Sequence, residues 1–131
     1  MFYNAQGIKR IPVINLSKCT ATNSVANFIG QMARAVTIDG IISSEKTNWV
    51  STSFDSNNPL THCIFSGVIG KNFYISNAKS LDYESLLSII DCLKDLRGTG
   101  TTLTITLGTT LIKKLTDADK ARITGKGWSI A

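Results

Sequence analysis

Short segments in which every second residue is apolar recur along the chain. The first has apolar or small residues at Ile11, Ile14, Leu16 and Cys19, and this spacing matches the strand template of leucine-rich repeats. Weaker copies follow around residues 36–38, 63–65, 73–75, 103–105 and 128–130. Each copy predicts a short strand that buries alternate side chains.

The spacing of these segments indicates how the chain travels between strands. Their reference positions are residues 14, 36, 63, 73, 103 and 128, so four of the five intervals are 22 to 30 residues long. Such intervals are near the period of an array in which a helix or turn carries the chain back after each strand. The interval of 10 between residues 63 and 73 has no room for a helix. The sequence leaves open whether it is a tight hairpin or a short coil of the array.

Residues 81–97 carry the clearest helix signals. Asp82 is the expected N-cap, and Leu81 and Leu86 have the spacing of a hydrophobic staple. An apolar stripe follows, and Gly98 is the expected end of the helix.

Two further helices are expected on weaker patterns. Residues 116–124 open with Thr116-Asp117-Ala118-Asp119, which resembles a capping box with Asp in place of Glu. Apolar residues at helical spacing predict another helix over residues 24–34. The polar stretch 43–59 reads as a long loop in which Trp49 and Phe54 are the packing anchors.

Strands that alternate with helices predict a parallel sheet joined by right-handed crossovers. A chain of 131 residues holds one compact domain or a few repeats. We therefore expect a single α/β domain over residues 1–131, a short right-handed leucine-rich-repeat-like solenoid. Its strands are mostly parallel, and its helices lie on the outer side. Irregular repeats fill residues 1–80, and a helix–strand–helix–strand cap fills residues 81–131.

Charge and hydropathy favour neither a nucleic-acid-binding nor a membrane-spanning protein. The net charge is +5, but the 14 basic residues are scattered and no aromatic ladder accompanies them. No window approaches the ~20 apolar residues that span a bilayer. We expect no nucleic-acid partner and no membrane span.

The cysteines and the single histidine offer little for catalysis. Cys19, Cys63 and Cys92 show no C-x-x-C spacing, and we expect buried, reduced thiols. His62 and Cys63 are neighbours on a predicted strand, so their side chains point to opposite faces. We predict no catalytic, cofactor-binding or metal-binding residue and no cofactor, and the chain reads as a protein without enzymatic activity.

In a repeat array, the strand residues between the buried ones form the usual binding surface. Here these candidate partner-binding residues are Asn15, Thr37, Ile64, Tyr74, Thr104 and Thr106. Tyr74 is an aromatic anchor for a glycan or protein partner in one interpretation and an ordinary exposed strand tyrosine in the other.

Both ends of the chain resemble a known family. Met1-Phe2-Tyr3-Asn4 followed by the strand at residues 11–19 is similar to one unit of the BspA-like bacterial leucine-rich repeat, although Ala5 stands where that unit has Cys. Residues 81–131 resemble the C-terminal end of leucine-rich repeat proteins of gut bacteria and their phages. The matching residues are Glu84-Ser85-Leu86, the strand at 103–108, Lys114-Leu115-Thr116-Asp117 and Lys126-Gly127-Trp128.

The resemblance implies a non-enzymatic interaction module of a bacterial surface protein or a phage tail-associated protein. As part of a longer protein, it would sit on the cell surface or virion and bind a surface protein or glycan. The alternative is a purely structural role, as a cap of a longer array or an assembly subunit of a virion. In that alternative, the edge strand around residues 11–16 pairs with another repeat or with a second copy.

Overall fold

The structure is a computed structural model that describes residues 2–3, 7–19, 24–30, 36–56 and 58–131. Within these residues every strand pair is parallel, and the helices are few. The expected mixed α/β class with parallel strands is confirmed. In the same residues, no helix has both the length and the apolar character needed to cross a membrane.

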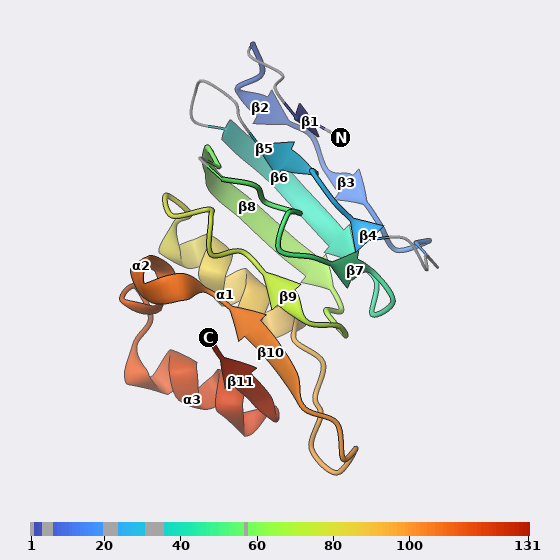
Figure 1. The fold of residues 1–131 in the computed structure, drawn as a ribbon, viewed down its shortest axis with the longest axis vertical. Coiled ribbons are helices and arrows are strands. Elements are labelled where there is room, and N and C mark those ends of the chain that lie inside the picture. The colour runs from blue at the N-terminus through green and yellow to red at the C-terminus, as the bar shows by residue number, and fades with distance from the viewer. Residues whose placement is uncertain (1, 4–6, 20–23, 31–35, 57) are drawn as a thin grey trace.

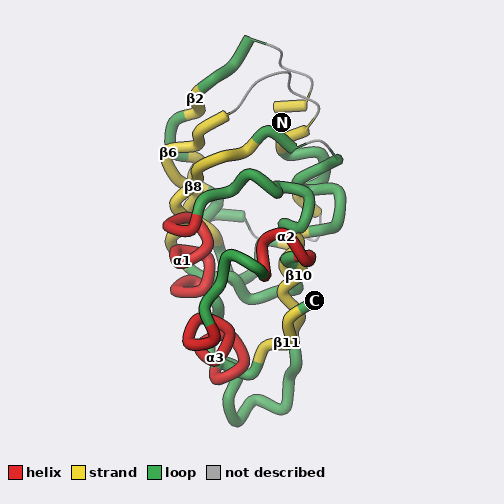
Figure 2. Tube along the Cα trace, turned by 90° about the vertical axis from the view of Figure 1, so that its left-hand side faces the viewer, coloured by secondary structure: helices red, strands yellow, loops and turns green. Residues whose placement is uncertain are grey.

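One side of the molecule is a column of strands continued by helices. The long strand β6 (Val36–Ser43) pairs with β8 (Leu60–Gly67) on one side and with the short strands β2 (Arg10–Ile11) and β3 (Ile14–Asn15) on the other. Helix α1 (Tyr83–Cys92) packs against β8, and α3 (Asp117–Gly125) packs against α1. Figure 2 shows this column from β2 down to α3.

The opposite side carries a second sheet. Its middle strand β10 (Leu103–Thr106) pairs with β9 (Phe73–Tyr74) and with β11 (Trp128–Ile130) (Figure 1). Two smaller parallel pairs join β1 (Phe2–Tyr3) to β5 (Ile29–Gly30) and β4 (Ser24–Val25) to β7 (Asn48–Trp49). The short helix α2 (Gly108–Ile112) follows β10.

Paired strands are separated by a nearly constant length of chain. Residue 25 pairs with residue 49, 24 positions later, and residues 38 and 103 pair with residues 63 and 128, each 25 positions later. The pairing of residue 73 with residue 105 is longer, spanning 32 positions, and the intervening segment contains α1 and a glycine turn.

All six predicted strand positions fall on observed strands, but they belong to two sheets. Residues 14, 36 and 63 lie in the sheet built on β6, and residues 73, 103 and 128 lie in the sheet built on β10. The hairpin alternative for residues 63–75 is wrong, because β8 pairs with β6 whereas β9 pairs with β10. Gly67 turns the chain between the sheets at a φ of 77°, where an added Cβ would lie 2.1 Å from the Ser43 carbonyl oxygen.

Five buried aromatic rings form the centre of the core. They are Phe28, Trp49, Phe54, Phe65 and Phe73, each at most 3% exposed. Trp49 stacks on Phe54 at 5.6 Å between ring centroids and meets Phe73 edge-on at 5.2 Å. The expectation that Trp49 and Phe54 anchor the polar stretch is confirmed, although that stretch also contains β7 and a bridge from Phe54 to Ile29.

On the edge away from β6, the strand β8 meets the helix α1 instead of another strand. Two serines of α1 accept the hydrogen bonds that its backbone amides donate on this edge. The Ser85 hydroxyl accepts a hydrogen bond from the Cys63 amide at 2.8 Å, and the Ser88 hydroxyl accepts one from the Phe65 amide at 2.9 Å. A helix uses its own backbone groups internally, so side chains must take the place of a strand partner here.

The N-terminus of α1 is as predicted, but its end is not. Asp82 is the N-cap and accepts a hydrogen bond from the Ser85 amide at 2.9 Å. The helix ends at Cys92 rather than before Gly98, because Leu93 is extended and bridges to Ile69 of the preceding chain segment.

A lysine side chain binds the free carbonyl groups at the C-terminal end of α1. The Lys126 ammonium donates to the carbonyls of Ile90, Asp91 and Leu93. It therefore caps α1, in agreement with the preference of cations for helix C-termini.

The other two helix predictions had opposite outcomes. α3 begins at the predicted capping box, in which the Thr116 hydroxyl accepts from the Asp119 amide and the Asp119 carboxylate accepts from the Thr116 amide. The helix expected over residues 24–34 is wrong, because residues 24–30 carry β4 and β5, and residues 31–35 lie outside the described residues. The amides of Phe28 and Ile29 bond to the Ser53 carbonyl instead of forming a helical turn.

Substitutions of the two neighbouring residues of β9 test the packing of the aromatic core. Phe73 is fully buried among the rings, whereas Tyr74 is half-buried on the other face of the strand. We expect Phe73→Ala to lower the free energy of unfolding by about 3–5 kcal/mol. Tyr74→Ala should lower it by under about 1 kcal/mol. Urea unfolding monitored by circular dichroism measures both, and similar losses in the two variants would contradict the orientation of β9.

Candidate binding site

The structure divides the six predicted binding residues between two surfaces. Asn15, Thr37 and Ile64 lie on β3, β6 and β8, whereas Tyr74, Thr104 and Thr106 lie on β9 and β10. They do not form one column, because their strands belong to two sheets. Alternation along a strand predicts its buried and outward faces but not the sheet to which the strand belongs. Whether either group binds a partner stays a prediction.

The second group lies beside an open pocket of about 380 Å³. Tyr74 lines the pocket, and its register partner on β10 is Thr106. Asn48 and Ser51 come from β7 and the turn after it, and Lys71 and Asn72 come from the segment that leads into β9. The pocket therefore lies where β7, β9 and the start of β10 meet.

Hydrogen bonds and core packing hold the walls of this pocket in place. The Asn72 side-chain oxygen accepts a hydrogen bond from the Thr104 amide at 2.9 Å, so the Asn72 amide nitrogen is turned away from that contact. Trp49 also lines the pocket and is held by the aromatic cluster behind it. A site supported in this way is organised before a ligand arrives.

The pocket is nearly neutral and has both polar and apolar walls. Among the described residues that line it, Lys71 is the one charged residue, and the other polar groups are amides and hydroxyls. The Trp49 indole nitrogen is buried without a hydrogen-bond partner among the described residues, which is a cost to stability. These groups offer hydrogen bonds and an aromatic surface, but no paired acid and base for catalysis.

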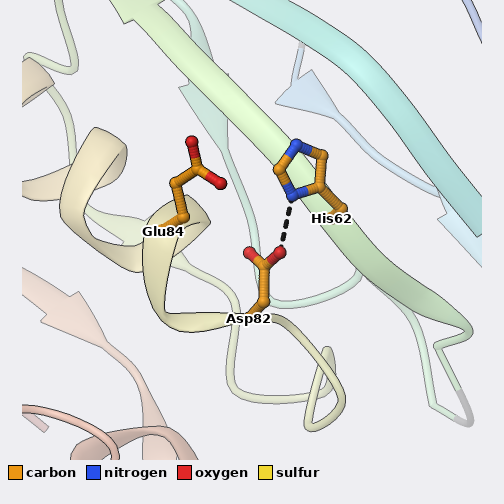
Figure 3. A group of neighbouring side chains, drawn as sticks. All are labelled: His62, Asp82 and Glu84. Atoms are coloured by element: carbon orange, nitrogen blue, oxygen red, sulfur yellow. Dashed lines mark hydrogen bonds and ion pairs between the residues drawn. The ribbon is translucent and has the colours of Figure 1, made fainter.

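A separate group of polar side chains lies on the other side of the molecule. His62 on β8 approaches Asp82 and Glu84 at the start of α1, and one ligand-type atom of each lies within 4.8 Å of the others (Figure 3). The His62 Nδ1 and the Asp82 Oδ2 are 2.6 Å apart. This group is not evident from the sequence, because His62 and Asp82 are 20 residues apart and only the packing of α1 on β8 joins them.

Hydrogen bonds favour the ionised form of Asp82. Burial raises the pKa of this carboxyl group, but the hydrogen bonds that it accepts from Ser85 and His62 outweigh burial and hold the pKa below its ordinary value. Asp82 is therefore a carboxylate at neutral pH.

The buried cysteines are not activated for chemistry. Cys63 is fully buried and Cys92 is 6% exposed, whereas Cys19 is half-buried only. Burial raises the pKa of Cys92 to about 11 and raises that of Cys63 further, so both thiols are protonated at neutral pH. The prediction that His62 and Cys63 face opposite sides of the strand is confirmed, since His62 is partly exposed.

The charge on Asp82 makes a testable contribution to stability. Asp82→Asn keeps an N-cap acceptor but removes the charge. Because the pKa of folded Asp82 is lowered, its carboxylate stabilises the fold above the unfolded pKa of about 4, and this effect disappears as pH falls through the folded pKa. We expect the parent chain to melt above the variant at pH 5 and the difference to narrow towards pH 2. Thermal melts followed by circular dichroism measure this, and a constant difference would show that the charge has no such role.

Comparison with protein-family models, with curated proteins and with solved structures found no match for this chain.

Proposed function

We propose that the chain is a non-enzymatic binding module whose partner is a surface glycan. The observation that carries this proposal is the Tyr74 pocket, in which a half-buried aromatic ring lies among amides and a hydroxyl on a well-packed framework. A protein partner is the other outcome that the tests below distinguish.

The scaffold of this module is, in our proposal, a short right-handed solenoid of the leucine-rich-repeat type. The strands pair in parallel at a step of about 25 residues, and the helices α1 and α3 lie across the molecule from β10 and β11 (Figure 2). Right-handed connection is the rule for parallel strands in one sheet. The resemblance of the N-terminal segment to a BspA-like repeat, and of residues 81–131 to the C-terminal end of leucine-rich repeat proteins, supports the same interpretation.

The chemistry of the pocket favours a glycan over a charged ligand. A sugar ring presents C–H groups on its faces and hydroxyls at its edge. The ring of Tyr74 is an apolar surface for the former, and Asn48 and Asn72 supply hydrogen-bonding amides for the latter. The volume of about 380 Å³ is within the range of small-molecule sites and suits one or two sugar units.

The structural alternative, a cap or assembly subunit, rests on the edge formed by β2 and β3. In the described residues these strands pair only with β6, and Val13 between them is 55% exposed. However, Pro12 lies at the same place and has no amide hydrogen to donate to a further strand. Since proline and a break in the strand protect edges against pairing, this edge supports assembly less well than the pocket supports binding.

Removal of the Tyr74 ring tests the proposed site. We expect Tyr74→Ala to abolish binding of the labelled chain to a printed array of bacterial surface and mammalian glycans, while its melting temperature stays near that of the parent. The physical reason is that anchor aromatics supply a large share of binding energy, often 2 kcal/mol or more, which is about thirtyfold in affinity.

Tyr83→Ala is the matched control. Tyr83 is a 42% exposed tyrosine on α1 whose hydroxyl donates to Asp119, so its removal costs stability without touching the pocket. The control should retain binding to the same glycans. Equal loss in both variants, or no glycan bound by the parent chain, would contradict the proposal, and binding to displayed surface proteins alone would favour a protein partner.

A further inference from the structure

We propose that His62, Asp82 and Glu84 form a binding site for a divalent transition-metal ion such as Zn²⁺. The three side chains offer an imidazole nitrogen and two carboxylates, and such ions accept this combination of ligands. The site lies in the column of β8 and α1, away from the Tyr74 pocket, and it is independent of the proposed glycan binding.

The spacing of the ligand atoms suits one ion. Three points that lie within 4.8 Å of one another always have a common point no more than about 2.8 Å from each, and zinc needs about 2.0–2.2 Å to nitrogen and oxygen. Side-chain adjustments of under about 1 Å therefore complete the coordination. Glu84 is exposed, so its side chain has room to move by this amount, and the remaining coordination positions would be open to solvent.

Local structure holds two of the three ligands in position. The Asp82 amide donates to the Thr61 carbonyl at 2.9 Å, which fixes the start of α1 beside the strand that carries His62. The Asp82 Oδ1 is used by the N-cap hydrogen bond from Ser85, and its Oδ2 points to the His62 Nδ1 (Figure 3). An ion bound to both atoms displaces the proton between them and needs the two atoms to move apart to about 3.3 Å, and neutral His62 then carries its proton on Nε2.

The local charges favour a cation. Among the described residues, Asp39, Glu45, Asp91, Asp95 and Asp117 each form an ion pair with a lysine or arginine. Neither Asp82 nor Glu84 does so there, and the side-chain partner of Asp82 is the imidazole of His62. The positive end of α1 opposes an incoming cation, but two full carboxylate charges exceed its partial charge of about one half.

The ligand set distinguishes between classes of ion. Calcium requires six to eight oxygen ligands and gains nothing from an imidazole. Zinc binds nitrogen and carboxylate oxygen with three protein ligands and a water, so it is the appropriate probe.

His62 is the only histidine in the sequence, so its imidazole signals in an NMR spectrum report on this site alone. The experiment adds Zn²⁺ at pH 7 to the full, untagged chain carrying Cys19→Ser, which removes the half-buried thiol as a competing ligand. We expect the His62 signals to shift with saturation at one equivalent, and calorimetry to give the same affinity. Glu84→Gln should weaken binding at least tenfold, because it replaces a charged ligand by a neutral amide.

Asp117→Asn is the matched control, since Asp117 is likewise a first-turn carboxylate of a helix and its side chain is fully exposed. It should leave zinc affinity unchanged. The proposal is overturned by a His62 signal that does not move with zinc, or by equal zinc affinity in Glu84→Gln and the parent. Ca²⁺ shifting the same signal as strongly as Zn²⁺ would overturn the assignment of the ion class.

Discussion

Contacts between aromatic rings, which successive passes of the chain bring to one place, hold this fold together. Several strands are only two residues long, and backbone pairing of this length does not hold a fold by itself. Phe65 on β8 packs against Trp49 on β7 and Phe73 on β9, so this contact joins the two sides of the molecule. A step of about 25 residues between paired positions is what aligns these rings.

The column of elements that runs from β2 to α3 changes from strands to helices where α1 packs on β8. Particular side chains make this change possible. Ser85 and Ser88 are three residues apart on α1 and accept the amide hydrogens that β8 directs towards the helix. At the other end, Lys126 caps α1, and the Trp128 indole donates to the Lys94 carbonyl at 2.8 Å. The backbone groups left by the transition are thereby satisfied, and the start of α1 is placed beside His62.

Local signals predicted local structure well. The caps at Asp82 and Thr116 are encoded within four residues, and all six strand positions follow from alternation. Features set by distant contacts were not predictable. Residues 24–30 have helical spacing but bond to Ser53, and alternation could not tell which sheet carries Ile64 and which carries Tyr74. The pocket residues Asn48, on the two-residue strand β7, and Asn72, just before β9, lie in segments without any periodic pattern, and only the folded chain brings them together.

Parallel pairing of strands one step of about 25 residues apart underlies the whole fold, and cross-strand nuclear Overhauser effects measure this pairing. The structure predicts backbone contacts between Ile38 and Cys63 within one sheet and between Leu103 and Trp128 in the other. Observation of both sets, in the pattern of parallel strands, would confirm the account. Antiparallel contacts between residues 60–67 and residues 73–74, together with the absence of the contact between Ile38 and Cys63, would contradict it.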